Sequence, residues 1–365
     1  MPVIAPREFH PGKTLFVGSV IVALIAFHWI RYHTGRYEAE DNLIRWTGQT
    51  MGTYYAISVV DWDLPDQDLA EQRRRITEYL DGINQQMSTY MADSEISRFN
   101  AFDSTEPFAV SAEFLTVTQT ALEWAGRTGG AFDPTLDPLI TLWGFGAKEV
   151  DLPPSPTAIE HALAITGFDQ IEVLEAESAI RKTAGYIQLN LNAIAKGHAV
   201  DGVAALLQEA GAENIFVEIG GDVVAFGVNP VGAAWRIGVE MPIPDSLPGE
   251  NMHGIAHISG GALAGSGEYR QLVELPDGST ISHIIDPRSG VPVQHNLIAV
   301  NVWAETCMVA DAVATALIVM GYEEGRQWIE IQDDIEAIFF TRDANGEIRA
   351  SMSSGFAEVT SYQLL

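Results

Sequence analysis

The chain is nearly without cysteine: Cys307 is the one thiol among 365 residues. A single cysteine excludes an internal disulfide framework and any zinc site built on several cysteines. It also lies too far along the chain to be the attachment site of an N-terminal lipid. Because Thr306-Cys307-Met308 leads into an apolar stretch, we expect a buried thiol rather than a nucleophile.

Positive charge is the second shortage. The 20 lysines and arginines are far outnumbered by 49 aspartates and glutamates, which gives a formal net charge of −29. A nucleic-acid partner needs a basic face, and the sequence offers none, so that class of function is excluded. The acidity itself indicates a well-solvated surface. It also means that an anionic phosphate ligand would need a cation to screen it.

Three common enzyme signatures are missing as well. His253 and His257 are four residues apart, but glycine follows the first of them where a zinc metalloprotease has its glutamate. Gly144-Phe145-Gly146 is followed by Glu149 where a dinucleotide fingerprint requires glycine or alanine. Ser266 lies directly between two glycines, which is not the spacing of a hydrolase nucleophile elbow.

One long apolar run occurs, from Leu15 to Ile30, without a charged residue inside it. A membrane span needs about 20 apolar residues, and about 17 at least, so the run is a short span or the core of a signal peptide. No convincing cleavage site of small residues accompanies it, so we expect an uncleaved membrane anchor, with a signal peptide as the alternative. The expected divisions are a cytoplasmic N-terminus at 1–13, the anchor at 14–31, a linker at 32–44 and a folded domain at 45–365.

Helical periodicity dominates the first half of the folded part, and strand patterns dominate the second. Asp277-Gly278, between two short apolar runs, predicts a hairpin. The expected helices are 69–87, 111–128, 157–166, 195–210 and 307–320; the expected strands are a group within 171–190 and the runs 53–60, 215–228 (interrupted at Gly220-Gly221), 272–275, 280–285, 297–303 and 337–340. This order predicts an α+β fold with mainly antiparallel or mixed sheets and flanking helices, preceded by the N-terminal transmembrane helix.

The clearest local chemistry is in Ala310 to Ala316. Asp311 and Thr315 are four residues apart, so on a helix they share one face among small or apolar neighbours. A carboxylate and a hydroxyl are hard oxygen ligands of the kind that magnesium prefers, with substrate phosphate completing the shell. The alternative is an aspartate that favours the helix dipole and a threonine bonded to its own backbone.

A second junction, Asn190 to His198, runs from a polar strand end into a helix. Helix amides at such a start can face an anion, and Lys196 adds a positive charge near it. A backbone carbonyl in the irregular part, such as that of Ala195, could ligate a cation. An ordinary strand-to-helix connection capped by asparagine is the competing interpretation.

His283 lies before a rigid turn, Asp286-Pro287. If 280–285 is a strand, His283 shares a face with Ile281 and Ile285. A histidine at a strand end beside a polar turn can act as a general base near neutral pH. A histidine satisfied within the core is the alternative.

Taken together and in order, several short stretches resemble one family, the FAD:protein FMN transferases, also called the ApbE family. Each stretch is weakly specific alone, but the ordered set spans about residues 45–345. The matching stretches are Met51-Gly52-Thr53, Met87-Ser88-Thr89-Tyr90, Ala131 to Thr135 with Leu142 to Gly146 behind it, Asn192 to Asp201, Val217 to Asp222, Ser266 to Tyr269, His283 to Pro292 and Ala310 to Thr315. Gly265 and Glu268 depart from the residues usual in the family, threonine and aspartate, and the lipid-attachment cysteine of many members is absent.

The resemblance implies roles at the matching positions. The metal would be magnesium, held by the Ala195 carbonyl, Asp311 and Thr315, and His283 would be the catalytic base. The residues that would hold FAD as substrate are Met51, Tyr90, Ala131, Phe132, Asp133, Asn192 and His198.

The resemblance also implies the reaction: magnesium-dependent transfer of the FMN half of FAD to a threonine or serine hydroxyl of an acceptor protein, with release of AMP. An FAD pyrophosphatase that forms FMN and AMP, and a non-catalytic flavin carrier, are the alternatives. Acceptors would be subunits of membrane redox complexes or extracytoplasmic reductases. The flavin transferase domain would lie in the periplasm, tethered to the inner membrane by the peptide anchor.

Overall fold

The computed structural model describes residues 42–145, 153–243, 246–247, 249–267, 272–275, 278 and 280–365. No helix within these ranges is long and apolar enough to cross a membrane. The expected anchor at 14–31 lies outside the described residues. The first described strand begins at Leu43, two residues before the expected start of the folded domain.

An eight-stranded sheet forms the centre of the molecule, in the order β1-β2-β6-β7-β10-β15-β16-β17. Each pairing along this order is antiparallel. The first two strands join through Met51-Gly52, where positive φ at both residues gives the tight turn favoured in hairpins. The strands are β1 (Leu43–Thr50), β2 (Thr53–Val60), β6 (Asn214–Ile219), β7 (Asp222–Phe226), β10 (Ala262–Gly267), β15 (Leu297–Ala304), β16 (Ile335–Arg342) and β17 (Ile348–Met352).

Both faces of the central sheet are covered. In β16, Ile335, Ala337 and Phe339 belong to the core on one face, and Ile338 and Phe340 to the core on the other. Side chains alternate between the faces of a strand, so a strand that is covered twice needs apolar residues at consecutive positions. This is why 337–340 is a continuous apolar run.

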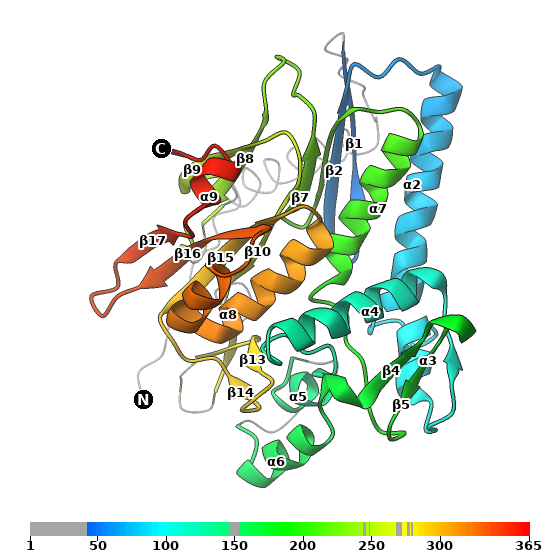
Figure 1. Ribbon diagram of the computed structural model, residues 1–365, viewed down its shortest axis with the longest axis vertical. Helices are drawn as coiled ribbons and strands as arrows, with labels where there is room; N and C mark the ends of the chain where they lie inside the picture. Colours follow the sequence, from blue (N-terminus) through cyan, green and yellow to red (C-terminus); the bar gives the residue numbers. More distant parts are fainter. Residues whose placement is uncertain are drawn as a thin grey trace, which may run out of the picture.

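Three long helices cover one face of the sheet: α2 (Asp66–Met87), α7 (Ala195–Glu209) and α8 (Cys307–Ile329). Figure 1 shows α8 across β10 and β15, with α7 beside it and α2 on the far side of α7. The five apolar residues whose spacing predicts the first helix are all buried, which confirms that prediction: Leu69, Ile76, Leu80, Ile83 and Met87.

A small sheet in the order β18-β9-β8 covers the other face. Its apolar residues Trp235, Ile237 and Val239 alternate along one strand and pack into the second core. These strands and the short helix beside them were not predicted. They are β8 (Trp235–Glu240), β9 (Met252–Ile258), β18 (Gln363–Leu364) and α9 (Phe356–Val359).

A smaller group of elements lies at one end of the helix layer (Figure 1). It contains a three-stranded sheet, in the order β3-β5-β4, and two short hairpins. The elements are α3 (Glu95–Ala101), α4 (Ala112–Arg127), α5 (Asp137–Leu142), α6 (Pro156–Ala164), β3 (Phe108–Ala109), β4 (Ile171–Leu174), β5 (Ala179–Lys182), β11 (Leu272–Glu274), β12 (Thr280–Ser282), β13 (Ile285–Asp286) and β14 (Val291–Pro292).

The predicted α+β class, with antiparallel sheets and flanking helices, is confirmed. The prediction of one strand over 280–285 is wrong. β12 ends at Ser282 and β13 begins at Ile285, because the Ile284 amide donates to the Ser282 hydroxyl at 3.2 Å instead of continuing a ladder. His283 therefore lies in a break between two strands.

The contact between α7 and α8 is very close at Gly197. A Cβ atom there would lie 2.3 Å from the Cys307 carbonyl oxygen and 2.7 Å from the Met308 Cα. Both neighbours are backbone atoms of another helix, which cannot rotate away. Gly197 is therefore required for the spacing of the two helices.

We expect Gly197→Ala to lower the free energy of unfolding by about 2 kcal/mol, as overpacking of a rigid contact does. Urea denaturation measures the change. Gly82→Ala is the matched control, because Gly82 lies within α2 and a Cβ there meets nothing within 4 Å. It should raise stability by about 0.5–1 kcal/mol. Equal effects of the two substitutions would contradict this account of the helix contact.

Candidate active site

One cavity of about 820 Å³ lies where the helix layer meets the smaller group of elements. Ligand sites commonly enclose about 300–1,000 Å³, so it can hold a large part of a cofactor-sized molecule. Its walls come from segments far apart in the chain, including the turn after α4, the start of α7, the end of β10 and the first half of α8. Among the lining residues are Tyr90, Ala131, Phe132, Asp133, Asn192, Lys196, Ser266, His283, Asp311 and Thr315.

A cluster of two carboxylates and one ammonium lies at the cavity, where Lys196 and Asp311 belong to the wall and Asp222 pairs with Lys196. The Lys196 ammonium pairs with the Asp222 carboxylate, and lies 3.7 Å from Oδ1 of Asp311. Asp222 and Asp311 are only 1% and 4% exposed, so little water reaches either carboxylate. Oδ2 of Asp311 accepts from the Gly197 amide at 3.1 Å.

The charges in this cluster shift each other's ionisation. Burial raises the pKa of Asp311 to about 7, although the Lys196 ammonium opposes the rise. Burial alone would lower the pKa of Lys196, but Asp311 and Asp222 more than offset this, and its pKa is raised. Lys196 therefore stays charged, and the cluster carries one negative charge when both carboxylates are ionised.

Hydroxyl groups extend the oxygen-rich wall. Thr315 follows Asp311 by one helical turn, as predicted, and its Oγ1 lies 3.3 Å from the Ser266 hydroxyl on β10. Within the described ranges, no three or more histidine, cysteine, aspartate or glutamate side chains form a metal-binding group. The predicted ligand set is of another kind, because it consists of a carbonyl, one carboxylate and one hydroxyl.

The predicted base, His283, lines the same cavity from the break between β12 and β13. Its ring meets that of Phe145 edge to face, with the centroids 6.2 Å apart. Shortly after His283 the chain reverses in a turn that begins at Asp286, where the Gly290 amide donates to the Asp286 carbonyl at 2.8 Å. The irregular backbone, rather than a strand, brings the imidazole to the cavity.

The turn Ala131-Phe132-Asp133 enters the cavity with its polar groups already bonded. Oδ1 of Asp133 accepts from the Thr135 amide at 2.8 Å and from its hydroxyl at 2.6 Å, and Oδ2 accepts from the Phe168 amide at 3.1 Å. Burial raises the pKa of Asp133, although these bonds oppose the rise. Asp133 thus fixes the shape of this wall.

Two further predicted residues lie at the rim. Tyr90 is 77% exposed, which leaves its ring available to a ligand. Asn192 is exposed, and its amide donates to Oδ1 of Asn190 at 3.0 Å. The Asn190 side chain in turn donates to Oδ1 of Asp137 at 3.0 Å, which ties the segment before α7 to α5.

Three predicted residues are not among those that line the cavity. Ala195 is buried at the start of α7, one residue from Lys196. Met51 packs against the main core at the β1–β2 turn. His198 is buried between helices, where its Nε2 lies 2.5 Å from Glu113 of α4 and 3.4 Å from the Tyr79 hydroxyl of α2.

The sequence offered only partial signals for the remaining cavity residues. Asp222 follows the Gly220-Gly221 hairpin turn, and Ser266 stands beside two glycines, yet neither pattern assigns a role. Ser266 lines the cavity, and Asp222 lies beside it through its pairing with Lys196, because β7 and β10 are neighbours in the sheet. That pairing of distant segments has no signature in either stretch alone.

The two helices that carry the charged cluster are also joined by a polar cap. The Asp201 carboxylate of α7 accepts from the Cys307 amide at 2.8 Å and the Met308 amide at 2.9 Å, at the start of α8. Burial raises the pKa of Asp201 to about 6 against these two bonds. Cys307 itself is buried, as predicted, and burial raises the pKa of its thiol.

Comparison with known proteins agrees with this fold. A relative from Vibrio cholerae serotype O1, named FAD:protein FMN transferase, is 41% identical over 283 residues, which cover 76% of this chain and 82% of the relative. A relative of the same name from Haemophilus influenzae is 34% identical over 328 residues, or 88% of this chain and 93% of its own. A solved structure described as the flavin transferase ApbE from Vibrio cholerae covers 87% of this chain and 98% of its own, with 38% identity and a TM-score of 0.77.

The antiparallel α+β fold and the polar cavity are therefore those of an enzyme, and its class is that of the transferases. The model of the ApbE family matches residues 51–339, which include every predicted site residue. The chain belongs to the ApbE family.

The Asp201 cap gives a prediction for pH dependence. Its folded pKa of about 6 lies above the ordinary 3.8, so the folded state holds this proton more tightly. The stability that this provides is complete below about pH 4 and is lost as the pH rises through about 6. At about 1.4 kcal/mol per unit of pKa difference, the free energy of unfolding falls by up to about 3 kcal/mol relative to Asp201→Asn, which does not titrate.

The measurement is urea denaturation of both proteins between about pH 4 and 7, since other titrating groups cancel in the difference. A difference that stays constant over this range would show that Asp201 is not protonated in the folded protein.

Proposed function

We propose that this chain transfers the FMN half of FAD to a threonine or serine hydroxyl of an acceptor protein, and releases AMP. The observation that carries the proposal is the meeting of three kinds of groups in one cavity: an imidazole at His283, a cluster of charges and hydroxyls at Lys196, Asp311 and Thr315, and the aromatic wall at Phe132 and Tyr90. Such a set can hold a flavin, a diphosphate and an attacking hydroxyl together. The names of the relatives from Vibrio cholerae and Haemophilus influenzae support the same reaction.

Magnesium fits the residues at the charged end of the cavity. Asp222 and Asp311 share one ammonium, so one negative charge is uncompensated where the anionic diphosphate of FAD would bind. A divalent cation corrects this imbalance, and oxygen donors are the ligands that magnesium prefers. Asp311, Thr315 and the Ala195 carbonyl would hold it. When bound, it would offset the charge that develops on the leaving phosphate.

The protein's own groups account for the remaining requirements of the transfer. His283 accepts the proton of the acceptor hydroxyl as its oxygen forms a bond to the phosphorus on the FMN side. The bond from this phosphorus to the bridging oxygen breaks, and that oxygen leaves with AMP. Lys196 faces the phosphates with a fixed positive charge. The reaction requires attack in line with the leaving group, so the acceptor segment enters opposite the AMP half.

Residues of the walls bind and orient FAD. Tyr90 offers a ring face to the flavin, and the buried Ala131-Phe132 turn supplies the apolar wall behind it. Asp133 holds the shape of the turn through Thr135 and Phe168. Asn192 supplies amide donors and an acceptor at the rim. Water excluded by this packing cannot compete with the acceptor hydroxyl.

The apolar segment at 14–31 supports a further proposal, that the domain is tethered to the inner membrane and faces the periplasm. Acceptors would then be subunits of membrane redox complexes or extracytoplasmic reductases. Fractionation of cells that make the full chain tests this, since recovery in the soluble cytoplasmic fraction would be incompatible with an anchor.

The decisive experiment incubates the full chain with FAD, magnesium and a purified candidate acceptor, such as a flavin-carrying subunit of a membrane redox complex. Covalent flavin fluorescence on the denatured acceptor, with one AMP per flavin, is the expected result. Free FMN and AMP without a labelled acceptor would indicate a pyrophosphatase, and intact FAD would indicate a carrier.

We expect His283→Ala to slow transfer by about 10²–10⁴, the usual contribution of a general base. FAD binding, followed by flavin fluorescence, should change little, because the charged cluster and the aromatic wall are intact. His257→Ala is the control, since His257 lines no part of the cavity and its ring Nδ1 donates to the Ser361 carbonyl at 3.1 Å. An undiminished rate in His283→Ala removes the histidine from the mechanism.

We expect Asp311→Ala to abolish the dependence of turnover on magnesium concentration. The variant loses the carboxylate that faces the uncompensated site, while Lys196 keeps its partner Asp222. Titration of transfer rate against magnesium, together with calorimetric titration of the metal without FAD, measures the effect. Titration curves that match the wild type in both measurements would show that the ion binds elsewhere.

A further inference from the structure

Helix α8 is divided by a break at Gly321, where φ is 76° and ψ is −179°. A side chain is excluded there, because a Cβ would lie 2.8 Å from Cδ2 of His295. The His295 Nε2 donates to the Ile318 carbonyl at 2.8 Å, three residues before the break. The break is thus a built feature that joins two helical segments in a fixed arrangement.

The segment beyond the break, Tyr322–Ile329, is firmly attached to the sheet; we call it the distal half of α8. The Tyr322 ring packs edge to face on Phe339 of β16, with the centroids 5.8 Å apart. Arg326 donates to the Met352 carbonyl at the end of β17. Gly325 approaches Leu317 of the first half so closely that a Cβ would lie 3.3 Å from its Cδ2. The distal half therefore cannot move independently of the sheet.

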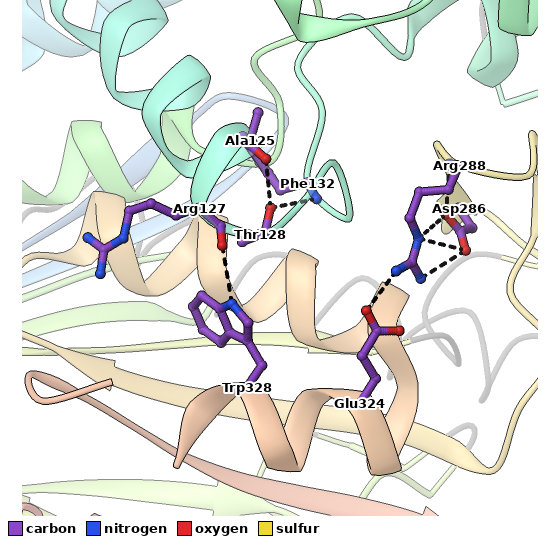
Figure 2. A network of polar contacts seen from close by, with 8 residues as sticks. All are labelled: Ala125, Arg127, Thr128, Phe132, Asp286, Arg288, Glu324 and Trp328. Atoms are coloured by element: carbon purple, nitrogen blue, oxygen red, sulfur yellow. Dashed lines mark hydrogen bonds and ion pairs between the residues drawn. The ribbon is translucent and has the colours of Figure 1, made fainter. Parts of the chain in front are cut away.

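One contact of the distal half reaches the turn that carries Phe132. The Trp328 indole donates to the Arg127 carbonyl, the last of α4, at 3.2 Å. The next residue, Thr128, accepts from the Phe132 amide at 3.2 Å through its hydroxyl. Figure 2 shows this path from the distal half through the end of α4 to the cavity turn.

A second contact reaches the loop that carries His283. Glu324 bonds to Nη1 of Arg288 at 2.7 Å, and Arg288 holds both oxygens of Asp286, with Nε to Oδ1 at 3.0 Å and Nη2 to Oδ2 at 3.1 Å (Figure 2). Asp286 follows His283 by three residues. The Glu324 and Arg288 side chains are 51% and 36% exposed, and such pairs contribute only about 0.2–1 kcal/mol to stability. The Glu324–Arg288 pair therefore affects the position of the His283 loop rather than the global stability of the protein.

We propose that the distal half of α8 is a brace that positions the Phe132 turn and the His283 loop relative to Asp311 and Thr315 on the first half of the same helix. The proposal rests on the proposed function and deepens it. Trp328, Glu324 and Arg288 are positioning residues, since they line no part of the cavity. A misplacement of about 1 Å can slow a reaction by about a hundredfold, so weak contacts at this distance can still govern the rate.

Two variants test the two arms of the brace in the full chain. Glu324→Ala should lower kcat by about tenfold with less than a twofold change in KM for FAD, because it loosens only the loop of the base. Trp328→Phe keeps an aromatic ring but loses the donor to Arg127, and should raise KM for FAD by about fivefold through the Phe132 turn. Neither variant should shift the midpoint of thermal unfolding by more than its control variant does.

Matched controls are present in the chain. Glu323→Ala removes an exposed neighbouring carboxylate from the same helix. Trp62→Phe removes another indole donor, whose bond of 3.1 Å to the Ala210 carbonyl also closes a helix end, but at α7 and away from the cavity. If each test variant matches its control in kcat and in KM, the brace has no role in the reaction.

Hydrogen exchange separates failure of the brace from failure of the proposed function, because it needs no turnover. Relative to the controls, Glu324→Ala should speed exchange of the Arg288 and Gly290 amides, and Trp328→Phe that of the Phe132 amide. Unchanged exchange at all three amides overturns the brace even if the wild type transfers flavin. Faster exchange in the two variants, together with a wild type that transfers no flavin, would support the brace while refuting the function.

Discussion

The arrangement of the site depends on one buried charge imbalance, the sharing of the Lys196 ammonium by Asp222 and Asp311. These groups come from three elements: the hairpin strand β7, the first turn of α7 and the first half of α8. Removing two carboxylates from water is costly unless they are paired, so the fold tolerates the cluster only with the lysine in place. The remaining negative charge is destabilising in the isolated protein. Under the proposed function, it would attract the divalent cation that accompanies an anionic diphosphate.

The close contact between α7 and α8 makes this sharing possible. Gly197 lets the two helices approach until backbone meets backbone, and its own amide donates to Asp311. The Asp201 carboxylate caps α8 from the same helix, only four residues further along α7. One short stretch of α7 thus supplies the ammonium, the close approach and the cap. This explains why so many features of the site are concentrated between residues 190 and 201.

The sequence predicted those parts of the protein whose signals are local. Helical spacing identified α2, α7 and most of α8, and the four-residue spacing of Asp311 and Thr315 identified the face that lines the cavity. Strands β8 and β9 were missed, because their short alternating runs stand among glycines and prolines and acquire meaning only against the central sheet. The strand predicted through His283 was wrong because the Ser282 hydroxyl accepts from the Ile284 amide and so ends the ladder. Periodicity of apolar residues does not report such a side-chain bond.

The same distinction between local signals and distant contacts applies to the ligand roles inferred from motifs. Asp311, Thr315, Phe132 and His283 reach one cavity from three separate segments, and only the ordered resemblance to a family indicated that they would. Asp222 was not assigned a role, because nothing near it in the sequence reveals that Lys196 lies beside it. His198 was assigned a role from its motif, but the motif does not reveal its partners. Its Nε2 contacts Glu113 of α4 and the Tyr79 hydroxyl of α2, so the ring lies between three helices.

The strongly acidic surface gives the local cluster its importance. Charges on the surface are screened over about 8 Å at physiological ionic strength, so most of the net charge of −29 has little effect deep in the cavity. The groups that decide whether a diphosphate binds are therefore the few that face it directly. Because only one of those in the cluster is positive, the proposed function makes affinity for the anion depend on a cation that accompanies it. An acidic enzyme of this kind would then bind its anionic substrate as a metal complex rather than as the free anion.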